Sequence, residues 1–469
     1  MSTNVSKQKR EALLAKLSEL REAVKEAPEL QATLDELQAL VARPSYGLVF
    51  EQHREEIEEV LDTHTPVLCE EADLRLESGG TDNLLIEGDN LAALQVLRTT
   101  HTGKIDVIYI DPPYNTGNKD FLFGDSFVTA EDAFKHSKWL SFMDKRLHLA
   151  ADLLADTGVI FISIDDNEMT HLKMLCDGIF GAHNFIAVLP RVTKKSGKDH
   201  TNTIAQNHDY VVVYVKDRSQ PIFCGIPSEE EGYPLFDEYF PIRGGYKLNQ
   251  TLDYDSLWYN EKMDFPLTVG EQSFVPGGSM EQHEKRHAGD HKPKDWVWRW
   301  SKEKFEFGYE NGFVVVKTGR DGKPRIYTKT YAKATISNTR PYQVVYKDRE
   351  TPLSSIALTD NRFSNDNAKK EITKLGLENF GFPKPTALVE QLLSIVRNAG
   401  TVLDFFAGSG TTGHAVMKLN AKDDGHRTFI LCTNNENDIC RKVTYERIKR
   451  AIEKNGYRAD LRYYKIQYN

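Results

Sequence analysis

The residues Asp111-Pro-Pro-Tyr114 come directly after an apolar run and could do chemistry on a planar amine. Residues 105–110 have the composition of a buried parallel strand, so Asp111 stands where that strand should end. Neither Pro112 nor Pro113 can donate a backbone hydrogen bond. We therefore expect a carboxylate, a free carbonyl and an aromatic face together at the carboxyl edge of a sheet, where open α/β sheets bind ligands. The exocyclic amine of a nucleobase fits this site, because it offers two N–H groups and a ring.

A second candidate site is the glycine-rich segment Gly408-Ser-Gly-Thr-Thr-Gly413, which has the pattern of a nucleotide-binding loop between a strand and a helix. Asp404 ends the strand before it, and Glu436 follows the next predicted strand. These carboxylates would meet an amino-acid ammonium and a ribose, which describes S-adenosylmethionine better than a dinucleotide. A nicotinamide dehydrogenase is the alternative, but no pyrophosphate-binding fold explains a second strand that ends in Asp-Pro-Pro-Tyr.

Strands and helices alternate around both motifs, which predicts an α/β fold with a mostly parallel sheet. A helix with Leu91, Leu94 and Leu97 separates the first two strands and completes a βαβ unit. The predicted strands are residues 84–86, 105–110, 158–164, 185–192, 210–215, 401–404 and 429–432.

The chain length predicts two or three structural units, and the composition changes along the chain suggest where they lie. Residues 1–62 carry two short apolar stripes punctuated by Pro28 and Pro44, which predicts a helical hairpin that packs on the body or on a second subunit. Residues 218–375 have scattered Gly, Pro, Tyr and Trp and little helical periodicity, which predicts an inserted domain. This insert separates residues 63–217, with Asp-Pro-Pro-Tyr, from residues 376–469, with the glycine loop.

Two basic segments are candidates for contact with nucleic acid. In residues 283–304, basic side chains that include Lys292, Lys294 and Arg299 alternate with tryptophans, a pattern that suits phosphate contact and base stacking. An ordinary strand with tryptophans on its core face is the alternative. Lys194, Lys195 and Lys198 could also contact phosphates, although a charged loop is usually only a solvated one. With a net charge of −9, any contact with DNA must come from such local patches.

We predict no metal site. His283-Glu-Lys-Arg-His287 matches the H-E-x-x-H signature of zinc proteases, but the glycines and proline around it predict a solvated basic loop. Asp165-Asp166 could be a metal pair, although a solvated strand end is commoner. The five cysteines form no close pair, which indicates reduced thiols in a cytoplasmic protein. No apolar run approaches the roughly 20 residues that span a bilayer.

Several longer segments resemble those of a known family. Asp111–Asn118, together with Asp404–Gly413, resemble the amino-methyltransferases of DNA in the permuted order called the β group. The wider sequence, which includes Leu84-Leu-Ile-Glu-Gly-Asp-Asn90 and Ile108–Asn118, carries a second resemblance. Across about 46–217 and 376–450 the chain is similar to the modification subunit of type III restriction systems. The resemblance implies an S-adenosylmethionine-dependent methyltransferase fold: a seven-stranded, Rossmann-like, circularly permuted sheet with helices on both faces and an α+β target recognition domain inserted between its halves.

The resemblance also implies which residues bind the cofactor. Glu436 would hold its ribose, and Asp89 would lie near its adenine. Lys384, Pro385 and Thr386 would close the site from the other side. The methionine part would be held by Asp404, Phe405, Phe406, Ala407, Gly408, Ser409, Gly410, Thr411 and Thr412.

The activity implied by the resemblance is methylation of the 6-amino group of an adenine flipped out of double-stranded DNA. Asp111 and the Pro112 carbonyl would accept its two N–H bonds, and Tyr114 would stack on its ring. An Asp before Pro-Pro-Tyr favours adenine over cytosine-N4. Methylation of RNA or of a protein glutamine remains open, as does a recognition subunit that only binds DNA for a nuclease.

The partners implied by the resemblance are a helicase-nuclease restriction subunit and a second copy of the chain in a homodimer. The chain is short for a type III modification subunit, and we expect the missing length to fall in the recognition insert. A solitary methyltransferase is therefore the alternative to a restriction complex.

Overall fold

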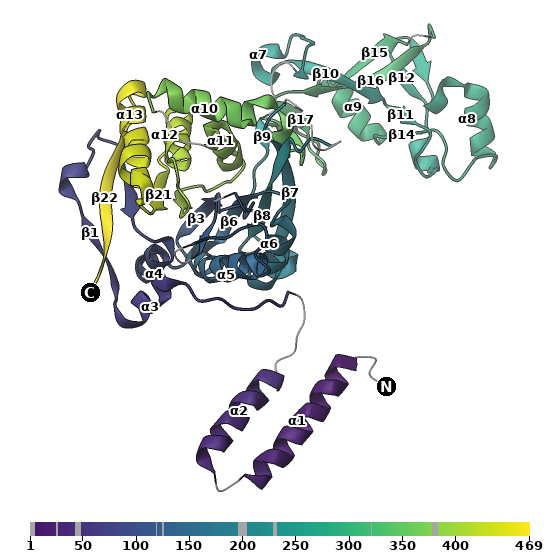
Figure 1. Ribbon diagram of the computed structural model, residues 1–469. Coiled ribbons are helices and arrows are strands. Elements are labelled where there is room, and N and C mark those ends of the chain that lie inside the picture. Colours follow the sequence, from purple (N-terminus) through teal and green to yellow (C-terminus); the bar gives the residue numbers. More distant parts are fainter. Residues whose placement is uncertain are drawn as a thin grey trace. The chain divides into compact units, whose positions relative to one another are not determined.

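The computed structural model describes residues 5–24, 27–42, 48–118, 120–123, 126–195, 204–227, 232–319, 321–377 and 383–469 (Figure 1). Contacts divide the chain into two compact units, Met1–Phe223 with Ser354–Asn469, and Cys224–Leu353. The second unit is shorter than the predicted insert of residues 218–375, because residues after Leu353 return to the first unit. No helix of the described residues has the length and apolar content needed to cross a membrane.

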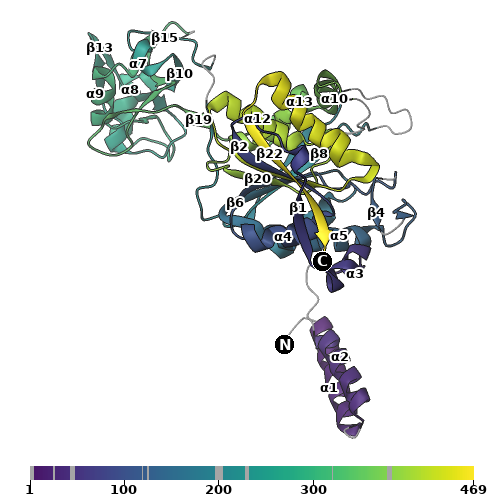
Figure 2. The same cartoon turned by 90° about the vertical axis from the view of Figure 1, so that its left-hand side faces the viewer.

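The first unit is built on a nine-stranded sheet with the order β1-β22-β2-β21-β20-β3-β6-β8-β7. All seven predicted strands are present, and the sheet is two strands wider than the seven implied by the resemblance. The additional strands, β1 and β22, pair antiparallel with each other at one edge (Figure 2). The strands are β1 (Pro66–Glu70), β2 (Thr81–Glu87), β3 (Ile105–Ile110), β6 (Leu154–Ile164), β7 (Phe185–Val192), β8 (His208–Val215), β20 (Thr401–Asp404), β21 (Thr428–Thr433) and β22 (Ala459–Tyr468).

The middle of the sheet joins the two halves of the chain. β20 pairs in parallel with β3, with Val402 opposite Val107 and Leu403 opposite Ile108. On its other side β20 pairs with β21, which in turn pairs with β2, and all these pairs are parallel. The carboxyl ends of parallel strands meet at the same edge of a sheet. Asp111 and Asp404, which lie far apart in the sequence, therefore lie at the ends of neighbouring strands.

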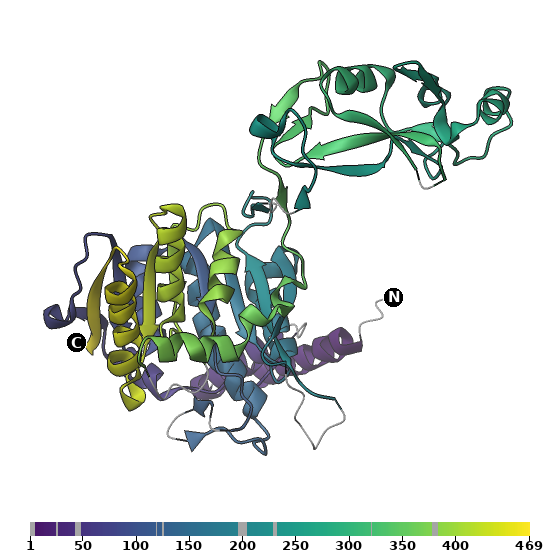
Figure 3. The same ribbon diagram turned by 90° about the horizontal axis from the view of Figure 1, so that it is seen from above.

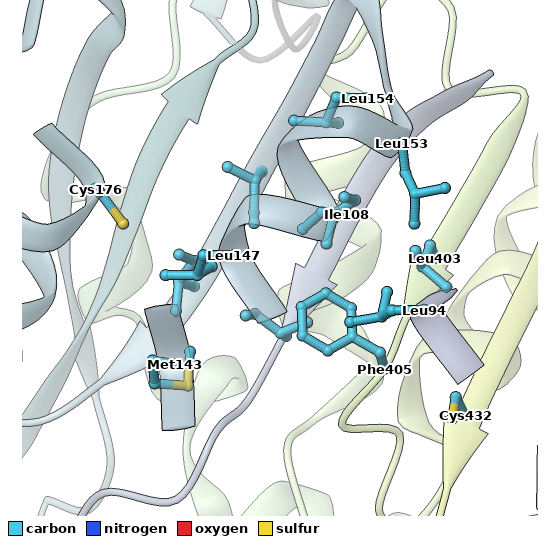
Figure 4. Packing of buried hydrophobic residues seen from close by; sticks show 14 of the residues in the cluster. Leu94, Ile108, Met143, Leu147, Leu153, Leu154, Cys176, Leu403, Phe405 and Cys432 are labelled. Atoms are coloured by element: carbon cyan, nitrogen blue, oxygen red, sulfur yellow. The ribbon is translucent and has the colours of Figure 1, made fainter. Parts of the chain in front are cut away.

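Helices cover both faces of this sheet, as predicted (Figures 1 and 3). On one face lie α4 (Asn90–His101), α5 (Lys135–Leu153) and α6 (Met169–Cys176), and on the other α11 (Thr386–Ser394), α12 (Thr411–Asp423) and α13 (Glu446–Asn455). Leu94, Met143 and Leu147 of α4 and α5 belong to one buried cluster with Ile108 and Leu403 of the central strands (Figure 4). This core holds rigid the strands whose ends carry the two motifs.

A buried ion pair ties α5 to the chain before α3 (Glu56–Thr63). Arg146 is fully buried and donates from Nη1 and Nη2 to the carboxylate of Glu55 at 2.8 and 3.0 Å. Its Nε donates to Asn90 at 2.6 Å, and Asn90 donates to the Phe405 carbonyl at 3.0 Å. One guanidinium thus joins α5, the start of α4 and the segment after β20.

We expect Arg146→Ala to lower the free energy of unfolding by about 3–5 kcal/mol, because it removes the two hydrogen bonds to the buried Glu55 carboxylate and leaves it with the more distant ammonium of Lys145, at 3.6 Å. Urea denaturation followed by circular dichroism measures the change. The matched control is Arg98→Ala, which removes an exposed pair with Asp152 (3.0 Å) and should cost no more than about 1 kcal/mol. Equal effects of the two substitutions would contradict the importance of the buried pair.

The predicted amino-terminal helical hairpin consists of α1 (Val5–Ala23) and α2 (Pro28–Ala42). The two helices contact each other, and Arg21 forms an exposed ion pair with Asp35 at 3.1 Å. Several leucines of the predicted apolar stripes remain exposed, namely Leu13, Leu20, Leu30 and Leu37. What they pack against stays a prediction.

The second unit has short strands and two small hydrophobic cores. Its main sheet has the order β10-β16-β15, formed by β10 (Tyr246–Thr251), β16 (Pro324–Tyr331) and β15 (Val314–Thr318). The two-stranded ladders are β9 (Ile226–Pro227) with β19 (Glu350–Thr351), β11 (Asp253–Tyr254) with β14 (Val297–Trp298), β12 (Leu267–Val269) with β13 (Gln272–Phe274), and β17 (Ala334–Ile336) with β18 (Val344–Tyr346). Its helices are α7 (Phe240–Arg243), α8 (Met280–His287) and α9 (Lys302–Glu310).

Two expectations for this unit are corrected or decided by the structure. His283-Glu-Lys-Arg-His287 is not a loop but the last part of α8, because Ser279 caps the helix and Arg286 is buried against Asp264. Among the tryptophans of residues 283–304, Trp298 is buried in the core and donates from Nε1 to the Phe265 carbonyl at 2.6 Å, and Trp300 packs against both small cores. For these two, the structure agrees with the core alternative.

Candidate functional site

Asp111 lies at the end of β3 and is paired with a buried lysine. Lys384 donates from Nζ to both carboxylate oxygens of Asp111, at 2.6 and 2.7 Å. The same ammonium lies 4.8 Å from the centre of the Tyr114 ring. The resemblance placed Lys384 beside the cofactor, and the structure places it on the predicted catalytic carboxylate. Sequence reasoning missed this pair because the two residues are in opposite halves of the chain.

Tyr114 is held through its hydroxyl, which donates to Asp209 Oδ2 at 3.0 Å. Asp209 is itself buried and paired with the buried Arg191, whose Nε donates to Oδ1 at 2.7 Å. Burial, with the neighbouring carboxylates of Asp111 and Asp209, raises the pKa of Tyr114 well above its ordinary value. Its hydroxyl stays protonated and orients the ring, so the side chain can stack on a planar group but cannot act as a nucleophile.

The carbonyls of Pro112 and Pro113 differ in their hydrogen bonding. The Pro113 carbonyl accepts a hydrogen bond of 2.7 Å from Nε1 of Trp139, which is fully buried in α5. In the described part of the chain, no donor is bonded to the Pro112 carbonyl. Trp139 therefore fixes the path of the segment, and the role of the Pro112 carbonyl as an acceptor stays a prediction.

The glycine loop after β20 is shaped by two glycines and one threonine. Gly408 and Gly410 have φ values of 47° and 77°, which favour glycine. The Thr444 hydroxyl donates to the Gly408 carbonyl at 2.6 Å, and a Cβ on Gly410 would lie 3.2 Å from Thr444 Cγ2. The loop therefore packs closely on the segment before α13 and leads directly into α12.

Asp404 is buried under this loop and holds it. Its Oδ1 accepts from the Phe406 amide at 3.0 Å, and its Oδ2 accepts from the Thr412 hydroxyl at 2.5 Å. Burial raises the pKa of Asp404 to about 7, against the lowering effect of these two hydrogen bonds. The carboxylate spans the loop from its start to the first turn of α12, and an approaching ammonium would compensate its buried charge.

The remaining hydroxyls of the loop are engaged by a buried arginine. Arg447 donates from Nη1 to the hydroxyls of Ser409 and Thr411 at 2.9 and 2.8 Å, and burial lowers its pKa to about 10. Thr411 also donates to the Lys384 carbonyl at 3.1 Å. Ser409 and Thr411 therefore support the loop, and Arg447 had no local signal in the sequence that would have singled it out.

Thr386 is the first residue of α11. The amide and hydroxyl of Thr386 donate to the Glu371 carboxylate at 3.0 and 3.1 Å, and Pro385 is the residue that precedes the helix. Glu371 belongs to α10 (Asn365–Lys374), which lies in the first unit although the sequence assigned it to the insert. These bonds fix the position from which Lys384 reaches Asp111.

A cavity of about 640 Å³ opens at the carboxyl ends of four neighbouring strands. Asp89, Phe405, Phe406 and Glu436, which the resemblance assigned to the cofactor, all line it together with Pro113. Phe121, Phe127 and Phe142 add further rings to the wall, and the ring of Phe142 lies 5.8 Å from that of Phe406. The lining does not include Lys384, Pro385, Thr386 or residues 407–412.

Asp89, which lines this cavity, also caps a helix. Its Oδ1 caps α4 by accepting from the amides of Leu91 and Ala92 at 2.7 and 3.2 Å. Its Oδ2 lies 3.8 Å from Arg146, so this carboxylate is only partly free. The arrangement of aromatic rings and acidic groups suits a ligand with an apolar ring and hydroxyl or amino groups.

Comparison with known proteins identifies the family. A family model described as DNA methylase, of the N6 and N4 type, matches residues 105–446. The chain belongs to this DNA methylase family. The match runs from the start of β3 to the first residue of α13, and so includes both motifs and the second unit.

Curated relatives point to restriction-modification proteins. The chain is 33% identical over 408 residues to the StyLTI type III restriction-modification Mod subunit of Salmonella typhimurium, covering 79% of this chain and 56% of that one. It is also 33% identical over 368 residues to the type II methyltransferase M.KpnI of Klebsiella pneumoniae, covering 76% and 81%. The chain thus spans little more than half the length of the type III relative.

Among solved structures, the chain matches the M1.HpyAVI complex with S-adenosylmethionine at 13% identity and a TM-score of 0.34, covering 78% of this chain and 98% of that one. It matches the cytosine-N4-specific PvuII DNA methyltransferase at 11% identity and a TM-score of 0.33, covering 81% and 95%.

The predicted DNA-contacting residues of this methylase lie in both units. Lys194 and Lys195 are exposed after β7, and Lys198 lies outside the described residues. In the second unit Lys292 and Lys294 are exposed, whereas Arg299 is half-buried and donates to the Gln250 carbonyl at 3.0 Å. Arg299 is therefore partly committed to its own unit, and the ammonium of the exposed Lys294 lies 5.8 Å from the centre of the Trp258 ring.

Asp404→Asn should change how stability depends on pH. An unfolded Asp titrates near pH 4 and the folded one near 7, so the folded state binds this proton more tightly. The stability that the group contributes is present below about pH 4 and lost as the pH rises through about 7. We therefore expect the difference in melting temperature, Asp404→Asn minus wild type, to become more positive as the pH rises from 4.5 to 7.5.

The control is Asp460→Asn. Backbone amides of Ser78 and Gly79 lower the pKa of Asp460, so its effect falls at and below about pH 4. The melting-temperature difference for this control should stay constant from pH 5 to pH 8. A flat profile for Asp404→Asn as well would show that the Asp404 carboxyl titrates normally.

Proposed function

We propose that this methylase transfers a methyl group from S-adenosylmethionine to the 6-amino group of an adenine in double-stranded DNA, at a specific site. The observation that carries the proposal is the parallel pairing of β20 with β3. It brings Asp111-Pro-Pro-Tyr114 to the same sheet edge as the cavity lined by Phe406 and Glu436. The family membership and the Mod-subunit relatives support a DNA substrate.

The cavity at this edge fits the cofactor. The rings of Phe406 and Phe142 offer an apolar wall for an adenine, and the Glu436 carboxylate can accept hydrogen bonds from ribose hydroxyls. The buried Asp404 attracts the ammonium of the methionine part. When bound, S-adenosylmethionine supplies an electrophilic methyl group on its sulfonium. Pro113 lies in the wall of the cavity, so the acceptor site adjoins it.

On the acceptor side, Asp111 and the Pro112 carbonyl accept the two N–H bonds of the target amine. Tyr114, oriented by Asp209, stacks on the base. The Asp111 carboxylate stabilises the positive charge that develops on the nitrogen and is the nearest acceptor for the proton released. Because Lys384 occupies both oxygens of Asp111, the amine must displace at least one of its bonds.

Adenine is the base that we propose. Asp at position 111 and the three Mod-subunit relatives at 30% identity or more support it. The family model covers both N6 and N4 methylation, so cytosine-N4 is the alternative that product analysis must separate. Methylation of RNA or of a protein glutamine would appear in the same assay as transfer to those acceptors.

Asp111→Asn should lower the initial rate of methyl transfer to duplex DNA by about 100-fold or more, because an uncharged amide stabilises the developing cation poorly. The assay uses labelled S-adenosylmethionine and nucleoside analysis of the product, with 6-methyladenine expected. The matched control is Asp82→Asn, an exposed carboxylate paired with Arg462 at the start of β2, which should keep the wild-type rate. Normal methylation by Asp111→Asn would refute the role of Asp111, and N4-methylcytosine would refute the choice of base.

Glu436→Gln should raise the Kd for S-adenosylmethionine by about tenfold, because hydrogen bonds to a charged acceptor are stronger than those to an amide. Isothermal titration calorimetry of the full chain measures the change. Asp438→Asn is the control, since Asp438 lies two residues on, pairs with Lys442 at 2.7 Å and does not line the cavity. An unchanged Kd for Glu436→Gln would remove the ribose contact from the proposal.

The proposed partners follow from the same reasoning. DNA is held by exposed lysines, namely Lys194, Lys195, Lys292 and Lys294, with the second unit acting as the target recognition domain. The type III Mod-subunit relatives support a restriction subunit as a partner. The exposed leucines of the α1–α2 hairpin support a homodimer.

A further inference from the structure

Next to the Asp111–Tyr114 segment, one buried carboxylate lies between two imidazoles. Glu168 is fully buried at the start of α6. Its Oε1 lies 2.7 Å from Nδ1 of His136, in the first turn of α5, and its Oε2 lies 2.9 Å from Nδ1 of His171, in the first turn of α6. The imidazole rings stack on each other, with centres 4.4 Å apart. These three groups can offer ligand atoms that all lie within 4.8 Å of one another.

The polar atoms of this cluster are incompletely satisfied. In the described part of the chain, Glu168 Oε2 and His171 Nδ1 make no hydrogen bond of acceptable geometry, although they are close. Asn115, which is also buried, donates to Glu168 Oε1 at 2.5 Å but leaves its own Oδ1 without a partner. Buried polar atoms are rarely left unpaired in folded proteins. Two of these atoms, Glu168 Oε2 and His171 Nδ1, lie 2.9 Å apart, and their unmet bonds indicate a bound group between the side chains.

The side chains of the cluster point to a cation. One carboxylate and two imidazoles can each offer a ligand atom, and these atoms all lie within 4.8 Å of one another. Neutral imidazole nitrogens and a carboxylate oxygen are the form in which these side chains bind metals.

We propose that His136, Glu168 and His171 bind one divalent transition-metal ion of the Zn²⁺ type. Two imidazoles and one carboxylate are a common ligand set for Zn²⁺ and related ions, whereas Mg²⁺ and Ca²⁺ prefer oxygen ligands only. Glu168 and His171 are three residues apart, so they lie on one face of the same helical turn. Both histidine side chains are partly exposed, at 40% and 33%, which gives the ion access and leaves positions for water.

The bound ion would help to position the Asp111–Tyr114 segment without touching it. It would hold Glu168, which binds Asn115, the residue that directly follows Tyr114. Asn115 has a φ of 57°, a conformation that needs support from its surroundings. Glu168 and Asn115 are therefore positioning residues. This consequence rests on the proposed function, whereas the metal site itself does not.

A second group with metal-binding residues serves as the matched control. Asp264, His283 and His287 of the second unit also come close together. Arg286 donates to both carboxylate oxygens of Asp264, at 2.8 and 3.0 Å, and so already neutralises the charge that a cation would need. We expect this group to stay empty.

The test is a titration of the full chain, freed of metal by a chelator, with Zn²⁺ alone. Calorimetry should show one tight site that is weakened by at least about 100-fold in His171→Ala and in Glu168→Gln, and unchanged in His283→Ala. Co²⁺ in place of Zn²⁺ should give visible absorption bands that the first two variants lose. Circular dichroism checks that each variant is folded. If one of the two cluster variants is not folded, His136→Gln is titrated in its place.

Three outcomes of the titration decide whether the metal site exists. No tight site in the wild type, or wild-type affinity in His171→Ala, would overturn it. Loss of the site in His283→Ala would move the ion to the second unit and would also overturn it. Because binding is read without DNA or S-adenosylmethionine, a failure of the proposed methylation would leave this result unaffected.

Discussion

The chemistry of this protein depends on one backbone interaction, the parallel pairing of β20 with β3. Val402 and Leu403 pair with Val107 and Ile108, which come from the other half of the chain. Since parallel strands end at a common edge, this register brings the Asp-Pro-Pro-Tyr segment next to the glycine loop. The permuted order of the motifs does not disturb the site, because a sheet is set by which strands pair and not by their order in the chain.

Buried arginines hold the loops that leave this edge. Arg447 binds two hydroxyls of the glycine loop, Arg191 holds the carboxylate that orients Tyr114, and Arg146 joins Glu55 to Asn90. A guanidinium offers several donors in a fixed plane, so one side chain can fix two segments at once. A buried guanidinium is stable only when its partners are in place. Each arginine therefore favours the one loop conformation that presents those partners to it.

Lys384 couples the two parts of the site. Its ammonium neutralises Asp111, and its carbonyl accepts from Thr411 in the glycine loop. One residue thus links the glycine loop to the Asp111 carboxylate. In the proposed reaction a neutral amine would replace this cationic donor at Asp111, because only a neutral nitrogen has the lone pair that methyl transfer needs.

Much of this structure could be predicted from local sequence. The apolar runs that end in Asp111 and Asp404 determined two central strands and their ends, and the glycines at 408 and 410 marked a loop that only glycine fits. The family resemblance supplied the cavity residues Asp89, Phe406 and Glu436, which the structure brings together. These features depend on residues that are neighbours in the chain, and their physical causes act over short distances.

What only the tertiary structure decided involves contacts between distant segments. The pairing of Lys384 with Asp111, the support of Tyr114 by Asp209, and the contact of His136 with Glu168 join residues that no spacing rule connects. The same limit explains the misjudged helix at His283, which is stabilised by a buried bond between Arg286 and Asp264. Sequence determines which side chains can do chemistry, but burial and pairing across the fold determine which of them are charged, held and available.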